Sequence, residues 1–294
     1  MRIAVLGAAG QLGRDLCPRL AALGEVVPLT RADINLDPGH HDAIAPAVTA
    51  QRPDVFVNCA AYNFVDKAES ESELETAIRV NTSAPRVLAS ACADIGAKFV
   101  HFSTDYVFGA DANRTTPYGE TDTADPVSWY GRSKLGGEER VELYSPNYLI
   151  IRTCGLYGVW GSGGKGGNFV ETMLRLAGQG KPLRVVHDQR CTPSYTADVA
   201  DATVQLLARG ASGLFHVTNS GVCSWYEFAA EIFRQSGLKP DLTPITSAEF
   251  GAAARRPAYS VLSNAKLASI GISPLRSWQD ALAAYLSERL TKQT

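Results

Sequence analysis

Short apolar runs alternate with amphipathic stretches through the first half of the chain. The runs are rich in β-branched and aromatic residues and occupy positions 2–6, 26–29, 55–58, 99–102 and 148–151. The stretches between them include 11–23 and 77–95, where apolar residues recur at helical spacing. Continuous apolar strands interleaved with helices are typical of a parallel sheet that is covered on both faces. The pattern therefore predicts an α/β protein with a Rossmann-type, doubly wound parallel sheet.

The pattern changes after Arg152. A glycine-rich run at 161–167 predicts a loop. Shorter units follow it, namely helices near 168–178, 197–209, 225–235, 263–270 and 277–290 and strands near 183–186 and 214–217. We expect residues 1–152 to form a dinucleotide-binding domain, to which later segments at about 183–217 return. Residues 153–294 should form mainly a smaller α/β lobe that binds substrate.

Composition narrows the class of protein. The chain has 294 residues, of which 45% are hydrophobic and 20% charged, and its formal net charge is −2. This balance gives no indication of a nucleic-acid or membrane-surface partner, and no apolar run approaches the length of a membrane span. The six cysteines are widely spaced and lack a Cys-x-x-Cys motif, so reduced thiols are expected rather than disulfides or a metal site. We expect a cytoplasmic protein that is a monomer or a homodimer.

A glycine motif marks the first strand–helix junction. Gly7, Gly10 and Gly13 follow the strand at 2–6 and open the helix that starts near residue 11. Glycines allow a tight turn and a close approach to a pyrophosphate, which the N–H groups of the helix N-terminus then bind. The motif predicts a dinucleotide site, although an ordinary tight turn is the alternative.

The end of the second strand bears on the choice of cofactor. Thr30 and Arg31 stand where an acid would bind the adenosine ribose, and Asp33 could still reach a ribose hydroxyl. Threonine and arginine accept a 2′-phosphate, which a carboxylate would repel. Arg31 is equally well explained as a solvated surface charge, so both NADPH and NADH stay open as cofactors.

Two further strand ends carry small or hydroxyl-bearing residues. Ala60, Ala61 and Tyr62 follow the third strand, where small side chains would let a cofactor lie flat over the sheet edge. Thr104 ends the fourth strand, and its hydroxyl could donate to a substrate carbonyl. Asp105 and Tyr106 would then point toward the substrate. Close strand–helix packing and a plain turn are the respective alternatives.

Tyr130 and Lys134 are the most informative pair. Their four-residue spacing places both side chains on one face of a helix. An ammonium beside a phenol favours the phenolate, so the pKa of Tyr130 is expected to fall toward neutrality, where a proton donor works best. With the glycine turn and Thr104, the pair predicts a nicotinamide-dependent reductase.

These residues together resemble the extended short-chain dehydrogenase/reductase family, most closely its branch that forms dTDP-L-rhamnose. The resemblance rests on segments 7–13, 60–69, 103–108 and 130–134, with 167–170 and 254–257 in the smaller lobe. It implies that NADPH or NADH reduces the C4 ketone of a dTDP-linked 6-deoxy-hexulose, with a catalytic set of Thr104, Tyr130 and Lys134. The cofactor contacts it implies are Gly10, Gln11, Leu12, Ala61, Tyr62, Asn63 and Phe102. The substrate contacts it implies are Thr104 and Asp105. We also expect Tyr106, Asn168 and Arg256 to contact the substrate. Paired arginines such as Arg255 and Arg256 match diphosphate oxygens, although such pairs are more often solvated surface charges.

Two positions depart from that family. Members often have an acid at the position of Thr30, and they usually have a tryptophan against the sugar at the position of Gly155. The loss of this ring predicts a wider sugar pocket, unless Tyr157 or Trp160 replaces it. The glycines that follow Trp160 could let it fold over the ligand as a lid.

Other functions remain open at this stage. A reductase or epimerase of another nucleotide sugar would use the same Tyr130 and Lys134. A dehydratase needs a glutamic acid where Tyr106 stands. A non-catalytic NADP-binding subunit, similar to the regulatory subunit of methionine adenosyltransferase, could also retain the catalytic residues.

Overall fold

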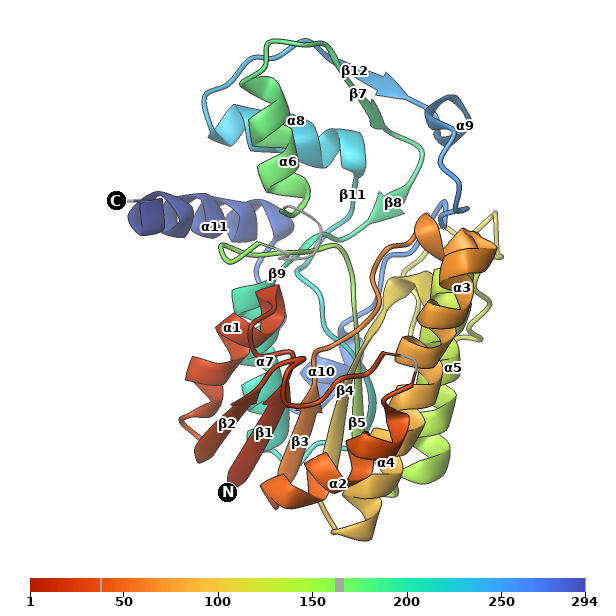
Figure 1. Cartoon of the computed structure of the whole chain (residues 1–294). Helices are drawn as coiled ribbons and strands as arrows, with labels where there is room; N and C mark the ends of the chain where they lie inside the picture. Colours follow the sequence, from red (N-terminus) through yellow and green to blue (C-terminus); the bar gives the residue numbers. More distant parts are fainter. Residues whose placement is uncertain (38, 162–166, 294) are drawn as a thin grey trace.

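A six-stranded parallel sheet forms the centre of the computed structural model, which describes residues 1–37, 39–161 and 167–293 (Figure 1). The strand order is β10-β5-β4-β3-β1-β2, and every neighbouring pair is parallel. The strands are β1 (Arg2–Leu6), β2 (Glu25–Leu29), β3 (Val55–Asn58), β4 (Lys98–Thr104), β5 (Tyr148–Thr153) and β10 (Gly213–His216). The predicted doubly wound fold is therefore confirmed.

Helices cover both faces of the sheet. On one face α1 (Gln11–Leu20) packs beside α7 (Thr196–Ala208), and on the other α4 (Ala84–Asp94) packs between α2 (His41–Gln51) and α5 (Trp129–Tyr144). Each face has its own buried cluster of apolar side chains. This double burial explains why the strands are apolar without alternation.

The helix expected over 77–95 contains a defect. α3 (Glu71–Ile78) passes into a π-helical turn at Arg79–Ser83 before α4 begins. Pro85, near the start of α4, has no N–H to donate to the preceding turn, which is one recognised cause of such irregularities. The turn carries Asn81, whose side chain is buried toward the candidate site.

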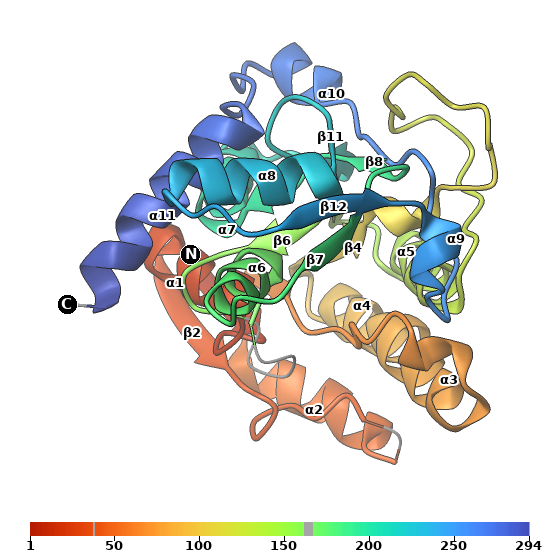
Figure 2. The same cartoon turned by 90° about the horizontal axis from the view of Figure 1, so that it is seen from above.

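The smaller lobe lies above the carboxyl ends of the strands (Figure 1). Seen from above, its helices and strands cover that end of the sheet (Figure 2). It contains α6 (Phe169–Ala177), α8 (Trp225–Gln235), α9 (Ser247–Phe250) and α11 (Trp278–Gln293), with α10 (Ala265–Ser269) below on the sheet domain, and the short strands β6 (Leu156–Tyr157), β7 (Leu183–Val186), β8 (Arg190–Cys191), β9 (Ser194–Tyr195), β11 (Cys223–Ser224) and β12 (Leu242–Ile245).

The segment 183–217, expected to return to the first domain, supplies strands to more than one sheet. α7 and β10 join the sheet domain, but β7 pairs with β12 in the smaller lobe. Apolar periodicity cannot specify a pairing partner, so the sequence pattern left this choice undecided. Of the predicted glycine loop, residues 162–166 lie outside the described part of the chain.

Candidate active site

The glycine turn between β1 and α1 has the geometry of a phosphate-binding turn. Gly7 has a φ of +81°, and a Cβ on Gly13 would lie 2.3 Å from the Gly7 carbonyl oxygen. Both positions therefore require glycine. Gly10 caps α1 without a side-chain hydrogen bond, and the first turn contains no acid. The positive end of the helix is thus available to an anion such as a pyrophosphate.

The neighbours of this turn connect it to the smaller lobe. The Gln11 side chain donates to the Leu156 carbonyl at 3.1 Å and accepts from Nδ2 of Asn168 at 3.1 Å. Asn168 also caps α6 by accepting from the Glu171 N–H. Leu12 packs in the core beneath α1. Asn168, expected to contact substrate, is therefore held beside the proposed pyrophosphate site.

At the end of β2, the predicted cofactor residues bond to one another and to the next turn. Both the N–H and the hydroxyl of Thr30 donate to Oδ2 of Asp33, at 2.7 and 2.9 Å. The backbone bond in particular holds the pKa of Asp33 below its usual value. Arg31 is 76% exposed and forms an ion pair with Asp37. The side chains of Arg31 and Asp33 are both exposed at this end of β2.

A buried amide fixes the loop after β3. Oδ1 of Asn81 accepts from the Tyr62 N–H at 2.9 Å, and its Nδ2 donates to the Tyr62 carbonyl and to the Ser133 hydroxyl, both at 3.0 Å. Asn58 accepts from the Ala60 N–H at 3.0 Å. Asn81 therefore connects the expected cofactor residues Ala60, Ala61 and Tyr62 to α5.

The predicted catalytic residues converge on the carboxyl end of β4. Nζ of Lys134 donates to the Phe102 carbonyl at 2.7 Å, and the Tyr130 hydroxyl donates to Oδ1 of Asn63 at 3.4 Å. The Thr104 side chain is close enough to lower the pKa of Tyr130 by hydrogen bonding. The α5 helix, capped by Ser128, presents both Tyr130 and Lys134 on the face toward the sheet.

The pKa of Tyr130 differs from the expectation. Burial, followed by the negative charge of Asp105, raises the pKa above its ordinary value, so the expected fall toward neutrality is wrong for the ligand-free chain. Burial also lowers the pKa of Lys134 to about 8, against the opposing effect of Glu138. Desolvation disfavours the charged form of each group, and it is the largest cause of both shifts. Tyr130 therefore keeps its proton and can donate it.

Asp105 and Tyr106, which follow Thr104, also lie at the carboxyl end of β4. Asp105 is 2% exposed, and burial raises its pKa to about 6 although Ser260, Cys154 and Thr104 hydrogen-bond to it. The Tyr106 ring meets the Tyr130 ring edge-on, with centroids 5.9 Å apart. Asp105 and Tyr106 thus lie next to the catalytic set, as expected for residues that face a substrate.

Arg256 extends the site into the smaller lobe. Its two terminal nitrogens bind the Asp66 carboxylate at 3.0 and 2.7 Å, and a hydrogen bond connects it to Tyr106. The guanidinium expected to bind a diphosphate is thus held by a carboxylate at the rim of the site. No local pattern predicts this pairing, because the two residues are 190 positions apart.

The space beside Gly155 is occupied by another ring. Gly155 has a φ of +51°, and a Cβ built on it would lie 3.1 Å from Cη2 of Trp225. A ring of the smaller lobe thus lies in the space where the sequence predicts a wider pocket. Neither suggested replacement fills it. Tyr157 is fully buried in the aromatic core of the lobe, and Trp160 donates to Asp15 of α1 at 3.0 Å.

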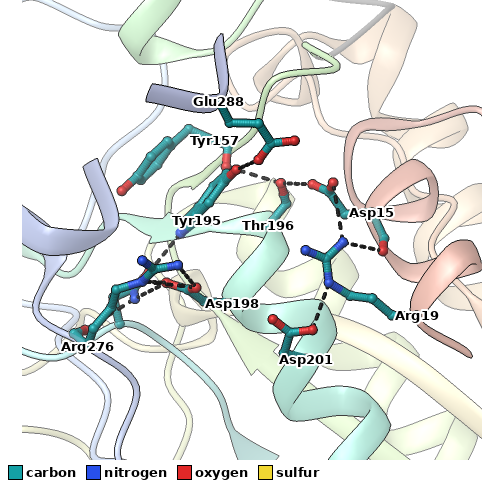
Figure 3. A network of polar contacts seen from close by, with 10 residues as sticks. Asp15, Arg19, Tyr157, Tyr195, Thr196, Asp198, Asp201, Arg276 and Glu288 are labelled. Carbon is teal, nitrogen blue, oxygen red and sulfur yellow. Dashed lines mark hydrogen bonds and ion pairs between the residues drawn. The ribbon is translucent and has the colours of Figure 1, made fainter. Parts of the chain in front are cut away.

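A polar network anchors the lobe to the sheet domain on the α1 side. Figure 3 shows Asp15 of α1 between Arg19 and Thr196, whose hydroxyl donates to the Asp15 carboxylate. In the same network Tyr195 donates to Glu288 of α11, and Arg276 pairs with Asp198. The Arg276–Asp198 pair joins the lobe to α7 of the sheet domain, and the Thr196–Asp15 bond joins α7 to the neighbouring α1.

Two kinds of feature are absent from the described residues, a metal-binding cluster and a membrane-spanning helix. No group of three or more His, Cys, Asp or Glu side chains is arranged to hold a metal ion within that part of the chain. None of the helices described is long and apolar enough to cross a membrane.

Comparison with known proteins agrees with this geometry. The chain is 43% identical to the spore coat polysaccharide biosynthesis protein SpsK of Bacillus subtilis, over 98% of each chain. It is 41% identical to a dTDP-4-dehydrorhamnose reductase of Mycolicibacterium smegmatis, over 96% of this chain and 84% of that one. The solved structure of dTDP-4-dehydrorhamnose reductase from Bacillus anthracis in complex with NADP superposes with a TM-score of 0.90 at 36% identity, covering 98% and 99% of the two chains. The model of the RmlD substrate-binding domain matches residues 1–291, and the chain belongs to that family.

Proposed function

We propose that the protein reduces the C4 ketone of a dTDP-linked 6-deoxy-hexulose with NADPH or NADH, and that dTDP-4-dehydrorhamnose is its substrate and dTDP-L-rhamnose its product. One observation carries the proposal, namely the convergence of Thr104, Tyr130 and Lys134 on the strand end beside the glycine turn. The names of the relatives, 41% and 36% identical, support the same reaction.

The residues present fit a nicotinamide dinucleotide. Gly7 and Gly13 leave a cradle that a Cβ would fill, and the uncapped start of α1 suits a pyrophosphate. Gly10, Gln11, Leu12, Ala61, Tyr62, Asn63 and Phe102 would surround the dinucleotide, and Lys134 would hold the ribose hydroxyls. When bound, the nicotinamide supplies the hydride that the ketone carbon accepts.

Side chains of the protein then stabilise and neutralise the negative charge that develops on the ketone oxygen. Thr104 orients the carbonyl by donating a hydrogen bond, and Tyr130 gives its proton to the same oxygen. The raised pKa of Tyr130 keeps that proton in place before the reaction. Lys134, once it binds the ribose, stabilises the phenolate left behind. Orientation of the two reactants should supply much of the rate enhancement.

The direct test is turnover by the purified protein with a panel of dTDP-4-keto-6-deoxy sugars, with NADPH and NADH in turn. We expect loss of the reduced nicotinamide and formation of a 4-hydroxy sugar, identified by NMR. Binding of NADPH without turnover of any sugar in the panel would instead favour a non-catalytic, NADP-binding subunit.

The cofactor preference rests on Thr30 and Arg31. Because a guanidinium can bind a 2′-phosphate, we expect NADPH to be used at least as well as NADH. Arg31→Ala should then raise KM for NADPH more than KM for NADH. Equal changes for the two cofactors would remove Arg31 from 2′-phosphate recognition.

We further infer a cytoplasmic enzyme that acts as a monomer or homodimer without nucleic acid. The near-neutral charge of −2 supports the absence of a polyanionic partner. Light scattering of the purified chain checks the oligomeric state, and fractionation of the source cells checks the compartment.

A further inference from the structure

Trp225 lies next to the residues that carry the proposed chemistry. Thr104 pairs with Thr153 across β4 and β5, and Cys154, the next residue, hydrogen-bonds to Asp105. Gly155 comes one residue later, and a Cβ there would meet Cη2 of Trp225 at 3.1 Å. The tip of the indole therefore lies along the backbone that leads away from the catalytic strand ends.

The indole is held in a defined position. Trp225 is the first residue of α8, and a capping box between Ser224 and Glu227 fixes the start of that helix. The ring packs at 4.9 Å, centroid to centroid, against Phe169, the first residue of α6. The helices α6 and α8 contact one another in the lobe above the sheet (Figure 1). Two helix starts thus present a pair of adjacent rings.

These rings are only partly enclosed. Trp225, Phe169 and Gly155 are each of intermediate burial, whereas the neighbouring Phe228 is fully buried. Both rings pack against the aromatic core of the lobe and keep part of their surface accessible to solvent.

We propose that Trp225, supported by Phe169, is the aromatic wall of the hexose subsite and determines sugar selectivity. The inference rests on the proposed function, since it names the surface of that same site that contacts the sugar. A 6-deoxy-hexose has an apolar C6 methyl group and an apolar C–H face, both of which gain from burial against an aromatic ring. The glycine at 155 leaves room for the indole, because a Cβ there would lie 3.1 Å from the ring, closer than an ordinary van der Waals contact, and the φ of +51° also favours glycine.

The test separates sugar recognition from nucleotide recognition. Calorimetry in the presence of NADP compares the Kd of dTDP with the Kd of a dTDP-6-deoxyhexose, for wild type and for Trp225→Ala. We expect the wild type to bind the sugar conjugate more tightly than dTDP. Trp225→Ala should reduce this gain about tenfold, the scale of one lost apolar contact in a pocket, with the Kd of dTDP unchanged. In turnover assays KM for the keto sugar should rise while KM for NADPH stays the same.

Trp160→Ala is the matched control. It also removes a partly exposed indole near the site, but this ring packs on Asp15 and Arg14 of α1. We expect this variant to leave the ratio of the Kd of dTDP to the Kd of the dTDP-6-deoxyhexose unchanged. Trp225→Leu keeps apolar volume without an aromatic face, so it reports on the ring even if the alanine variant does not fold.

The outcomes distinguish the two proposals. An unchanged gain in Trp225→Ala or Trp225→Leu, with a wild type that turns over, overturns the aromatic wall and leaves the proposed function standing. An equal loss of affinity for dTDP and its sugar conjugate overturns it too, because it shows a general packing role. A wild type that neither turns over a keto sugar nor gains affinity from the sugar refutes both proposals.

Discussion

Tyr130 owes its state to burial more than to its partner. It is 8% exposed, and the loss of solvation keeps the phenol protonated although Lys134 lies one helical turn away. A proton donor for a reduction must hold its proton until the oxygen becomes basic. The raised pKa of Tyr130 meets this requirement.

Removal of the Tyr130 hydroxyl should lower the rate of turnover more than the affinity for the cofactor. We expect Tyr130→Phe to lower turnover by about a hundredfold or more, the usual scale for a lost positioned proton donor, because the ring remains in place without its hydroxyl. Cofactor affinity, measured by fluorescence titration, should change little. Near wild-type turnover would exclude Tyr130 from the mechanism.

Lys134 should set the alkaline limit of activity. Its pKa is lowered to about 8, so the ammonium is present below that pH and is lost as the pH rises through it. We expect kcat/KM to fall above about pH 8, since that ratio reports on the free enzyme. Lys134→Arg, whose guanidinium stays charged, should lose this limb at a reduced overall rate. A limb that persists in Lys134→Arg would assign the titration to another group.

At the scale of elements, the β1–α1 turn has no room for a side chain at Gly13. A Cβ on Gly13 would lie 2.3 Å from Gly7 O and 2.7 Å from Ala8 Cα, both of them backbone atoms that cannot rotate away. We expect Gly13→Ala to displace α1 and weaken NADPH binding about tenfold or more, as a misplaced binding element does. The measurement is Kd for NADPH together with the melting temperature.

Gly119→Ala is the control for that change. The nearest atom to a Cβ at Gly119 is 4.0 Å away, at Oδ2 of Asp122, so the variant should bind NADPH as the wild type does. Equal affinities of Gly13→Ala and the wild type would show that the turn adjusts without cost and that the glycine motif is not required.

At the scale of the whole molecule, the Arg256–Asp66 pair connects the lobe to the sheet domain beside Tyr106. We expect Arg256→Ala to raise KM for the sugar nucleotide about tenfold through loss of orientation. KM for NADPH, whose proposed site lies over β1 and β3, should not change. Arg255→Ala provides the control, because Arg255 is an exposed neighbour of equal charge. Similar effects of the two substitutions would indicate a general charge effect.

The sequence by itself determined the parts of this protein that depend on local spacing. The glycine turn, the apolar strands and the shared face of Tyr130 and Lys134 all follow from residues a few positions apart. The order of the strand ends then predicted where these groups meet, because parallel strands share one carboxyl edge.

Only the tertiary structure decided the features that depend on burial and on distant partners. The pKa of Tyr130 rose because the fold encloses the phenol, which periodicity does not report. β7 paired with β12, Arg256 with Asp66, and Trp225 occupied the space beside Gly155, each joining segments far apart in the chain. Such contacts depend on how the lobe packs over the sheet, because a side chain's partner across the fold is set by packing geometry and not by its neighbours in sequence.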